Sequence, residues 1–312
     1  MAKHIILVHG RSFKPQKQTL TDSWTEALRH GIARDYGDDK AQAFDDVNIT
    51  MAYYGGLSNA FLASLGQTYD EAADVADRAA ALNALKQVPS AAEFLGDAGK
   101  ARYDALPGKT ALKEFFADSL AGSLSFMGLS EPVITQFAPD VGHYWDHNSP
   151  YGSSVRMTLT EILAPALENN DKVLLLSHSL GTMIAYDVLW KFSHYGEYQD
   201  IPDRKVPVWI TLGSPLGDET VKRNLKGAGV AGPGKYPGNI GRWINIAAED
   251  DYISHDEEIA NDYRKMKQWG LVGSIRDHPI YNLSVRWGES NPHHGAGYLI
   301  HPEVSKIVAN WV

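Results

Sequence analysis

Short apolar runs alternate along much of this chain with segments whose apolar residues recur at helical spacing. Continuous apolar runs are typical of strands buried on both faces, and they predict strands at His4–Val8, Val47–Tyr54, Lys172–Leu176, Val206–Leu212, Trp243–Ala247 and Ile280–Trp287. Helical spacing predicts helices at Thr21–His30, Arg156–Glu168, Leu180–Phe192, Asp256–Trp269 and Pro302–Trp311. Strands that alternate with helices favour the α/β class, with a mostly parallel sheet flanked by helices on both faces.

The pattern changes between residues 57 and 141, where helical spacing dominates and β-branched residues are few, as in YDEAADVADRAAALNALKQV. We therefore expect residues 1–56 and 142–312 to form the α/β core. Residues 57–141 are predicted to be a mostly helical insertion between early strands and a candidate lid. Within it, Leu124–Phe137 is apolar enough to line an acyl-binding site, although packing of helices against the sheet edge would produce the same pattern.

The stretch VLLLSHSLGT predicts a strand that passes into a helix within a few residues, with Ser179 at the apex. Such a turn strains the apex residue and brings the backbone on its two sides close together, so small residues are needed at Ser177 and Gly181. The Ser179 hydroxyl would then stand at the carboxyl end of the sheet and at a helix N-terminus, which stabilises negative charge. A plain strand–turn–helix connection is the alternative interpretation.

At this turn the chain resembles the α/β-hydrolase superfamily, and LLLSHSLGT is similar to the nucleophile elbow of serine esterases and lipases. The resemblance covers residues 3–54 and about 155–312, with Ser177 in the place where the elbow usually has glycine. It implies a serine hydrolase that cleaves a small-molecule carboxylic ester through an acyl-enzyme intermediate, with Ser179 as the nucleophile. An acyltransferase using the same residues, or a non-catalytic member that binds a ligand or a partner, are the alternatives.

A serine nucleophile needs a histidine to take its proton, and the family's chain order places that histidine after the serine and the acid. This order excludes His178, which we expect the turn to aim away from the pocket. The loop SNPHHGAGYLIHP follows the last predicted strand, where the resemblance locates the base. We expect His294 to be the base because Gly295 follows it, with His293 as the alternative.

The acid that orients the histidine is expected in WINIAAEDDYISHD, after the preceding strand. Asp251 is the first choice, because Asp251-Tyr252-Ile253 matches the Asp, any residue, β-branched pattern of the family. Asp250 is the second choice, and Asp218, which follows TLGSPLG, is the third. A helix cap or a solvated loop carboxylate is the alternative role for each of these acids.

An oxyanion formed at the substrate carbonyl would be held by backbone amides. The Leu180 amide is placed for this role by the turn. The resemblance suggests that the segment HGRSF supplies the second amide, from Arg11 or Ser12. Neither His-x-x-x-His nor comparable ligand spacing is present, so we expect no metal and no cofactor.

The composition limits the kinds of binding partner and the cellular location that we expect for this protein. The chain has 312 residues, 29 Lys and Arg against 38 Asp and Glu, a net charge of −9, and no cysteine. A negative chain without a basic cluster does not favour nucleic acid, and the missing cysteines exclude thiolate chemistry. The first strand begins too early for a signal peptide, and no apolar run is long enough to span a membrane. We therefore expect a cytoplasmic protein without stable membrane insertion, while the sequence leaves its oligomeric state open.

Overall fold

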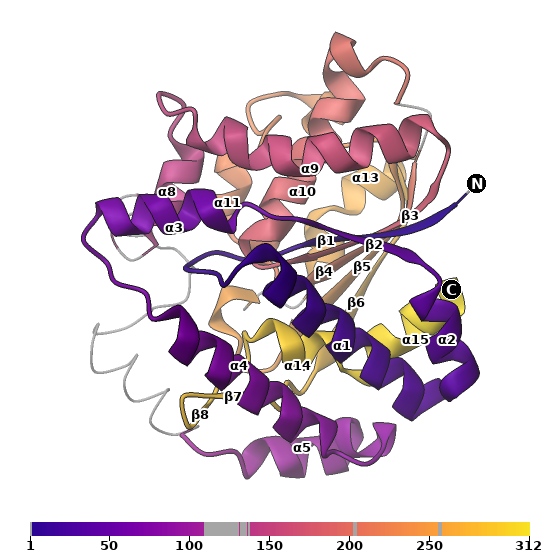
Figure 1. Ribbon diagram of the computed structural model, residues 1–312. Coiled ribbons are helices and arrows are strands. Elements are labelled where there is room, and N and C mark those ends of the chain that lie inside the picture. Colours follow the sequence, from indigo (N-terminus) through magenta and orange to yellow (C-terminus); the bar gives the residue numbers. More distant parts are fainter. Residues whose placement is uncertain (1, 109–130, 132–135, 137, 202–204, 255–257) are drawn as a thin grey trace.

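The computed structural model describes residues 2–108, 131, 136, 138–201, 205–254 and 258–312. At its centre lies a six-stranded sheet of parallel strands in the spatial order β2-β1-β3-β4-β5-β6 (Figure 1). The strands of this sheet are β1 (Lys3–Val8), β2 (Asn48–Ala52), β3 (Lys172–His178), β4 (Val206–Leu212), β5 (Ile240–Ala248) and β6 (Val272–Ile280). A separate antiparallel pair follows, formed by β7 (Val285–Arg286) and β8 (Glu289–Ser290).

Helices cover the sheet on both faces (Figure 1). Among the described residues, the α-helices before β3 are α1 (Lys17–Tyr36), α2 (Asp38–Asp45), α3 (Gly55–Ser64), α4 (Glu71–Lys86), α5 (Gly96–Asp104), α8 (Pro139–Trp145) and α9 (Tyr151–Glu168). Those after β3 are α10 (Leu180–His194), α11 (Glu219–Asn224), α12 (Ile259–Asp262), α13 (Arg264–Gln268), α14 (Gly295–Leu299) and α15 (Pro302–Trp311). Single 3-10 turns lie at Ala91–Phe94, Gly196–Tyr198, Pro215–Gly217, Gly232–Lys235 and Tyr252–Ser254.

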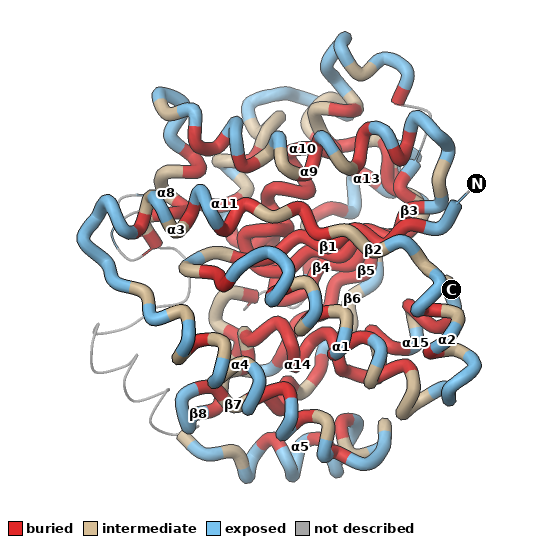
Figure 2. Tube along the Cα trace, viewed as in Figure 1, coloured by how far each residue is buried: buried red, intermediate tan, exposed pale blue. Residues whose placement is uncertain are grey.

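The apolar side chains of the strands pack into two hydrophobic cores, one on each face of the sheet. In β1, Ile5 and Leu7 pack with α1, α14 and α15, whereas Ile6 and Val8 pack with α9 and α10. Successive side chains of a strand point to opposite faces, so a strand covered on both sides needs an apolar residue at every position. Figure 2 shows the result, with buried central strands and helices that are exposed only on their outer faces.

The α/β class with a parallel sheet between two helical layers is confirmed, and most predicted elements lie within a few residues of their observed bounds. The last predicted strand is wrong. The final strand of the sheet is β6 (Val272–Ile280), and most of the predicted strand Ile280–Trp287 is a connection that ends in β7. Because β6 is an edge strand, only its two end residues are buried, and it therefore lacks the continuous apolar run used to recognise the others.

The predicted helix Asp256–Trp269 is also corrected. Residues 255–257 lie outside the described residues, and the rest forms two short helices, α12 and α13.

The described part of the predicted insertion is helical and joins the main core. Leu82 and Leu85 of α4, together with Phe94 and Tyr103, belong to the same apolar cluster as α1 and α15. Except for Glu131 and Gln136, the candidate acyl-site segment Leu124–Phe137 lies outside the described residues. The role of residues 57–141 as a lid therefore stays a prediction.

None of the helices in the described part of the chain combines the length and hydropathy that a bilayer-spanning segment needs.

Candidate active site

The turn between β3 and α10 places Ser179 at a strained backbone position. Ser179 has φ 55° and ψ −128°, in the region that favours glycine. Its amide donates to the Leu212 carbonyl at the end of β4, 3.0 Å away, which fixes the turn against the neighbouring strand. The side chain is 2% exposed and stands at the N-terminus of α10.

The small residues around this turn are required by close backbone contacts. A Cβ on Gly181 would lie 2.5 Å from the His9 carbonyl oxygen and 2.6 Å from that of Val8, so α10 can approach the end of β1 only with glycine there. Ser177 accepts a hydrogen bond from Trp209 Nε1 at 2.9 Å. Serine at that position therefore anchors an indole of β4, which glycine could not do.

Ser179, His293 and Asp251 form one chain of hydrogen bonds. His293 Nε2 lies 2.8 Å from Ser179 Oγ, and His293 Nδ1 lies 3.0 Å and 2.9 Å from the two carboxylate oxygens of Asp251. Because a carboxylate only accepts, Nδ1 carries the proton and Nε2 accepts from the serine hydroxyl. The His293 side chain is 27% exposed and that of Asp251 is fully buried. The arrangement leaves a basic nitrogen against the hydroxyl.

Asp251 is held as an anion despite its burial. Burial acts to raise its pKa, but the charge and hydrogen bonds of His293, with donation from Tyr298 Oη at 2.6 Å and the Ile253 amide at 3.0 Å, lower the pKa to about 2. Tyr298 Oη also accepts from the Ala248 amide, 2.9 Å away at the end of β5. Nothing in the sequence pattern indicated Tyr298, since its partner lies 47 residues away.

The preference for His294 over His293 does not agree with this geometry. His294 Nδ1 lies 2.6 Å from Ser284 Oγ, and the residue is 8% exposed at the start of α14. Burial, with Arg78 and Arg286 nearby, places the pKa of His294 well below its usual value. Gly295 begins α14, and a Cβ there would lie 3.4 Å from Trp24, an ordinary contact, so this glycine gives no reason to prefer His294.

The other candidate acids have different partners. Asp250 Oδ2 accepts from Tyr103 Oη at 2.9 Å. Asp218 caps α11, where Oδ1 accepts from the amides of Thr220 and Val221 at 2.8 Å and 3.0 Å. The structure therefore brings Asp251 to the histidine, and it gives Asp218 the capping role that was its alternative.

His178 does not point away from the site as expected. It lines the same cavity as Ser179, and its Nε2 donates to the His293 carbonyl oxygen at 2.8 Å. Its ring lies 4.7 Å from that of His293. Burial, with the charge of His293, places the pKa of His178 well below its usual value. A neutral His178 thus holds the backbone of the residue that contacts Ser179.

Gly213 lies directly behind the histidine and the acid. Its φ is +53°, and a Cβ there would lie 2.8 Å from Asp251 Oδ2 and 3.0 Å from His293 Nδ1. Only glycine fits this position without displacing the pair. The sequence feature that could have indicated this role is the first glycine of TLGSPLG, which follows a predicted buried strand directly.

The loop after β1 lies against the serine. A Cβ on Gly10 would be 2.8 Å from Ser179 Cβ. The Gly10 carbonyl bonds to His9 Nδ1 at 2.8 Å, while His9 Nε2 accepts from the Tyr54 amide at 3.1 Å. The next peptide is held by Asp140, whose carboxylate accepts from the Ser12 amide at 2.7 Å and from Arg11 Nε at 2.9 Å. The Ser12 amide is thus already engaged, which argues against Ser12 as an oxyanion donor.

Ser179 borders a larger and a smaller hollow in the described part of the chain. The larger has a volume of about 230 Å³ and is lined by His293, His178 and the loop after β1, among others. The other is a small apolar hollow of about 10 Å³ beside Leu180, Met183 and Val141. No group of three His, Asp or Glu side chains among the described residues is arranged to hold a metal ion.

Neither a protein-family model, nor a curated protein, nor a solved structure matches this chain.

Proposed function

We propose that this chain is a serine hydrolase of the α/β-hydrolase type that cleaves a carboxylic ester through an acyl-enzyme. The proposal depends on one observation, the 2.8 Å contact between Ser179 Oγ and the His293 nitrogen whose opposite side is bonded to buried Asp251. A hydroxyl, a base and an orienting carboxylate in this geometry are the parts that nucleophilic acyl transfer requires. The strained φ of Ser179 supports the same proposal, because strain of this kind gathers at active sites.

The reaction would proceed in two halves. Ser179 Oγ attacks the ester carbonyl carbon while His293 Nε2 takes the hydroxyl proton, and Asp251 stabilises the imidazolium. His293 then donates that proton to the leaving alkoxide oxygen, and the carbonyl carbon stays bonded to Ser179. Water next attacks the acyl carbon and gives a proton to His293. His293 returns that proton to Ser179 Oγ as the carboxylic acid leaves.

Two backbone amides are the proposed oxyanion donors. The Leu180 amide is the first of α10, so no intrahelical acceptor is available for it. The Arg11 amide belongs to the peptide whose carbonyl, that of Gly10, bonds to His9. In a trans peptide the C=O and N–H point in opposite directions, so His9 turns the Arg11 amide away from itself. Removal of one such donor costs about 3 kcal/mol of transition-state stabilisation in serine hydrolases.

A fluorophosphonate probe tests the nucleophile. We expect the native protein to be labelled at Ser179, and Ser179→Ala to abolish labelling. Ser153→Ala, at an exposed serine of α9, is the matched control and should label like the wild type. Mass spectrometry locates the adduct. Absence of labelling in a folded wild-type protein would contradict the proposal and favour a non-catalytic binding protein.

Esters of 4-nitrophenol with increasing acyl length test the reaction. We expect acetyl and butyryl esters to be hydrolysed with a higher kcat/KM than octanoyl esters, because the mostly apolar hollow beside Ser179, Leu180 and Met183 has a volume of only about 10 Å³. Added alcohols distinguish hydrolysis from acyl transfer, since a transferase would form the new ester in preference to the free acid. A preference for long acyl chains would contradict the expected specificity.

A further inference from the structure

The 230 Å³ cavity beside Ser179 is lined by cations. Arg11, Lys14, Arg78 and Arg286 all contribute to its wall, and within the described residues no carboxylate does. This differs from the chain as a whole, whose net charge is −9. The charge of the side chains that line this cavity is therefore opposite in sign to the net charge of the chain.

Three of these cations are paired with carboxylates that lie behind the cavity wall. Arg11 bonds to Asp140 at 2.9 Å and Arg78 to Asp74 at 2.7 Å. Arg286 contacts both Asp74, at 2.7 Å, and Asp77. The three guanidinium groups thus form ion pairs with the three carboxylates of Asp140, Asp74 and Asp77, and these six charges sum to zero.

Lys14 is the fourth basic residue of this wall, and its contacts differ from those of the three arginines. The residue is 8% exposed, and its Nζ donates to the carbonyl oxygens of Arg11, Ser12 and Phe13, the last at 3.1 Å. In the described part of the chain no carboxylate lies within ion-pair distance of it. Carbonyl dipoles satisfy its hydrogen bonds but carry no net charge. Burial, reinforced by Arg78 and only partly offset by the charges of Asp140 and Asp74, lowers the pKa of Lys14 to about 7.

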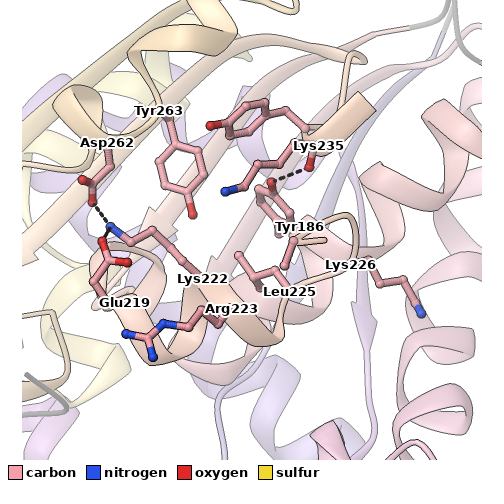
Figure 3. A pocket seen from close by; sticks show the side chains of 11 residues that line it. Tyr186, Glu219, Lys222, Arg223, Leu225, Lys226, Lys235, Asp262 and Tyr263 are labelled. Atoms are coloured by element: carbon pink, nitrogen blue, oxygen red, sulfur yellow. Dashed lines mark hydrogen bonds and ion pairs between the residues drawn. The ribbon is translucent and has the colours of Figure 1, made fainter. Parts of the chain in front are cut away.

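A second lysine, Lys222, lies at a cavity wall but forms ion pairs with carboxylates of the protein. Lys222, at another cavity lined by Tyr186 and Tyr263 (Figure 3), has Nζ 2.7 Å from Glu219 and 2.9 Å from Asp262. Its charge is neutralised by the protein itself. Lys14 and Lys222 are both partly enclosed lysines at cavity walls, and of these two only Lys222 has a carboxylate of the described residues in contact.

We propose that the ester hydrolysed at Ser179 carries a carboxylate, which binds in this cavity beside Lys14 and Arg78. The proposal rests on the hydrolase function proposed above and adds its substrate class, a small acidic ester. A carboxylate carries the one negative charge that Lys14 lacks among its contacts in the described residues, whereas a phosphate dianion would bring a second charge that this residue does not match. The volume of about 230 Å³ restricts the bound part of the ester to a few carbon atoms.

Binding to Ser179→Ala tests the proposal without turnover. Isothermal titration calorimetry compares two matched pairs: mono-4-nitrophenyl glutarate with 4-nitrophenyl pentanoate, and 4-acetoxybenzoate with 4-methylphenyl acetate. The carboxylate lies on the acyl side in the first pair and on the alcohol side in the second. We expect the acidic member of at least one pair to bind about tenfold tighter or more, and added NaCl to reduce this preference. The proposal would be overturned if the two members of each pair bound with equal affinity. It would also be overturned if inorganic phosphate bound to the cavity more tightly than the acidic esters do.

Substitutions locate the charge. Lys14→Met and Arg78→Gln should each reduce the affinity for the acidic ester about tenfold and leave the neutral ester unchanged. Lys222→Met removes the same charge at the other cavity and should leave both affinities at wild-type values. Lys14 also supports the loop after β1, so Arg78→Gln provides an independent readout. If both variants weaken the acidic and neutral esters equally, these cations support the backbone only, and the proposal fails.

The two proposals fail in different ways. Loss of the acidic preference with intact fluorophosphonate labelling of the wild type would leave the hydrolase and remove the substrate class. Tight binding of the acidic ester to Ser179→Ala, together with no labelling and no hydrolysis by the wild type, would leave an anion-binding site and remove the hydrolase.

Discussion

Two adjacent histidines have opposite roles in this structure, and the difference comes from where each ring points. His293 is partly exposed, contacts Ser179 and is fixed by Asp251. His294 is buried one residue later and bonds to Ser284. Both line the same cavity, so proximity to the serine does not distinguish them. The hydrogen-bond partners do.

Alanine substitution of each histidine separates the two roles. His293→Ala should lower kcat by a factor of about 10⁴ or more, because it removes the proposed base and leaves only binding and the proposed oxyanion donors. His294→Ala should retain most of the activity and instead lose about 1 to 3 kcal/mol of stability, since it leaves a cavity and an unpaired Ser284 hydroxyl. Steady-state kinetics and urea unfolding measure both. The reverse ranking of kcat would contradict the assignment of His293.

At the scale of elements, the junction of β3 and α10 stores strain. Ser179 adopts a φ of 55° that a residue with a Cβ rarely adopts. Contacts of Gly181 with β1 and of the Ser179 amide with β4 hold the turn in place. The strain is therefore maintained by the packing around it.

Replacing the apex residue measures this strain. Both Ser179→Gly and Ser179→Ala remove the hydroxyl, but only glycine adopts the observed φ without penalty. We expect Ser179→Gly to unfold in urea with a free energy about 1 kcal/mol higher than Ser179→Ala. Equal stabilities would mean that the turn relaxes once the hydroxyl is lost.

A second close contact between elements joins α1 to the C-terminal helices. A Cβ on Gly31 would meet Ser305 Oγ of α15 and would lie 2.9 Å from the Ile300 carbonyl. Gly31→Ala should therefore cost about 1 to 2 kcal/mol, even though alanine favours the helix. Gly196→Ala is the control, because no atom lies within 4 Å of a Cβ there, and it should change stability by less than about 0.5 kcal/mol. Thermal and urea unfolding measure both variants.

At the scale of the whole molecule, the parallel sheet brings the site together. Gly10, Ser179, Gly213 and Asp251 each follow the carboxyl end of a different strand, β1, β3, β4 and β5. Parallel strands place these ends along one edge of the sheet. Residues as far apart as Gly10 and His293 therefore line one cavity.

Acid unfolding reports on the buried acid. The pKa of Asp251 falls from its usual 3.8 to about 2 on folding, so the native state binds fewer protons than the unfolded state in this window. Asp251 thus contributes stability above about pH 4, and this is lost as the pH falls toward 2. Between pH 5 and pH 3 we expect the free energy of unfolding of the wild type to fall by about 1 kcal/mol more than that of Asp251→Asn. Urea titrations at each pH measure it, and parallel curves would contradict a lowered pKa.

The elements that the sequence predicted well are those whose local pattern is strong. The strand Val206–Leu212 and the helix Pro302–Trp311 have their predicted bounds, because the first is buried on both faces and the second has a regular apolar face. The edge strand β6 escaped prediction because exposure removes the apolar run. Asp251 was predicted from its place after a strand together with the family pattern that Asp251-Tyr252-Ile253 matches, whereas Tyr298 and His178 have partners 47 and 115 residues away.

By itself, the sequence determined the α/β class and the turn at Ser179, while the family resemblance pointed to the loops that carry His293 and Asp251. The class and the turn follow from periodicity and from the need for small residues at a tight turn, which act over a few neighbouring positions. Only the tertiary structure decided which of His293 and His294 meets Ser179, that Asp140 engages the Ser12 amide, and that Lys14 Nζ bonds to backbone carbonyls of the loop after β1. Such choices depend on side-chain directions and on charges contributed by distant elements, and no local pattern encodes them.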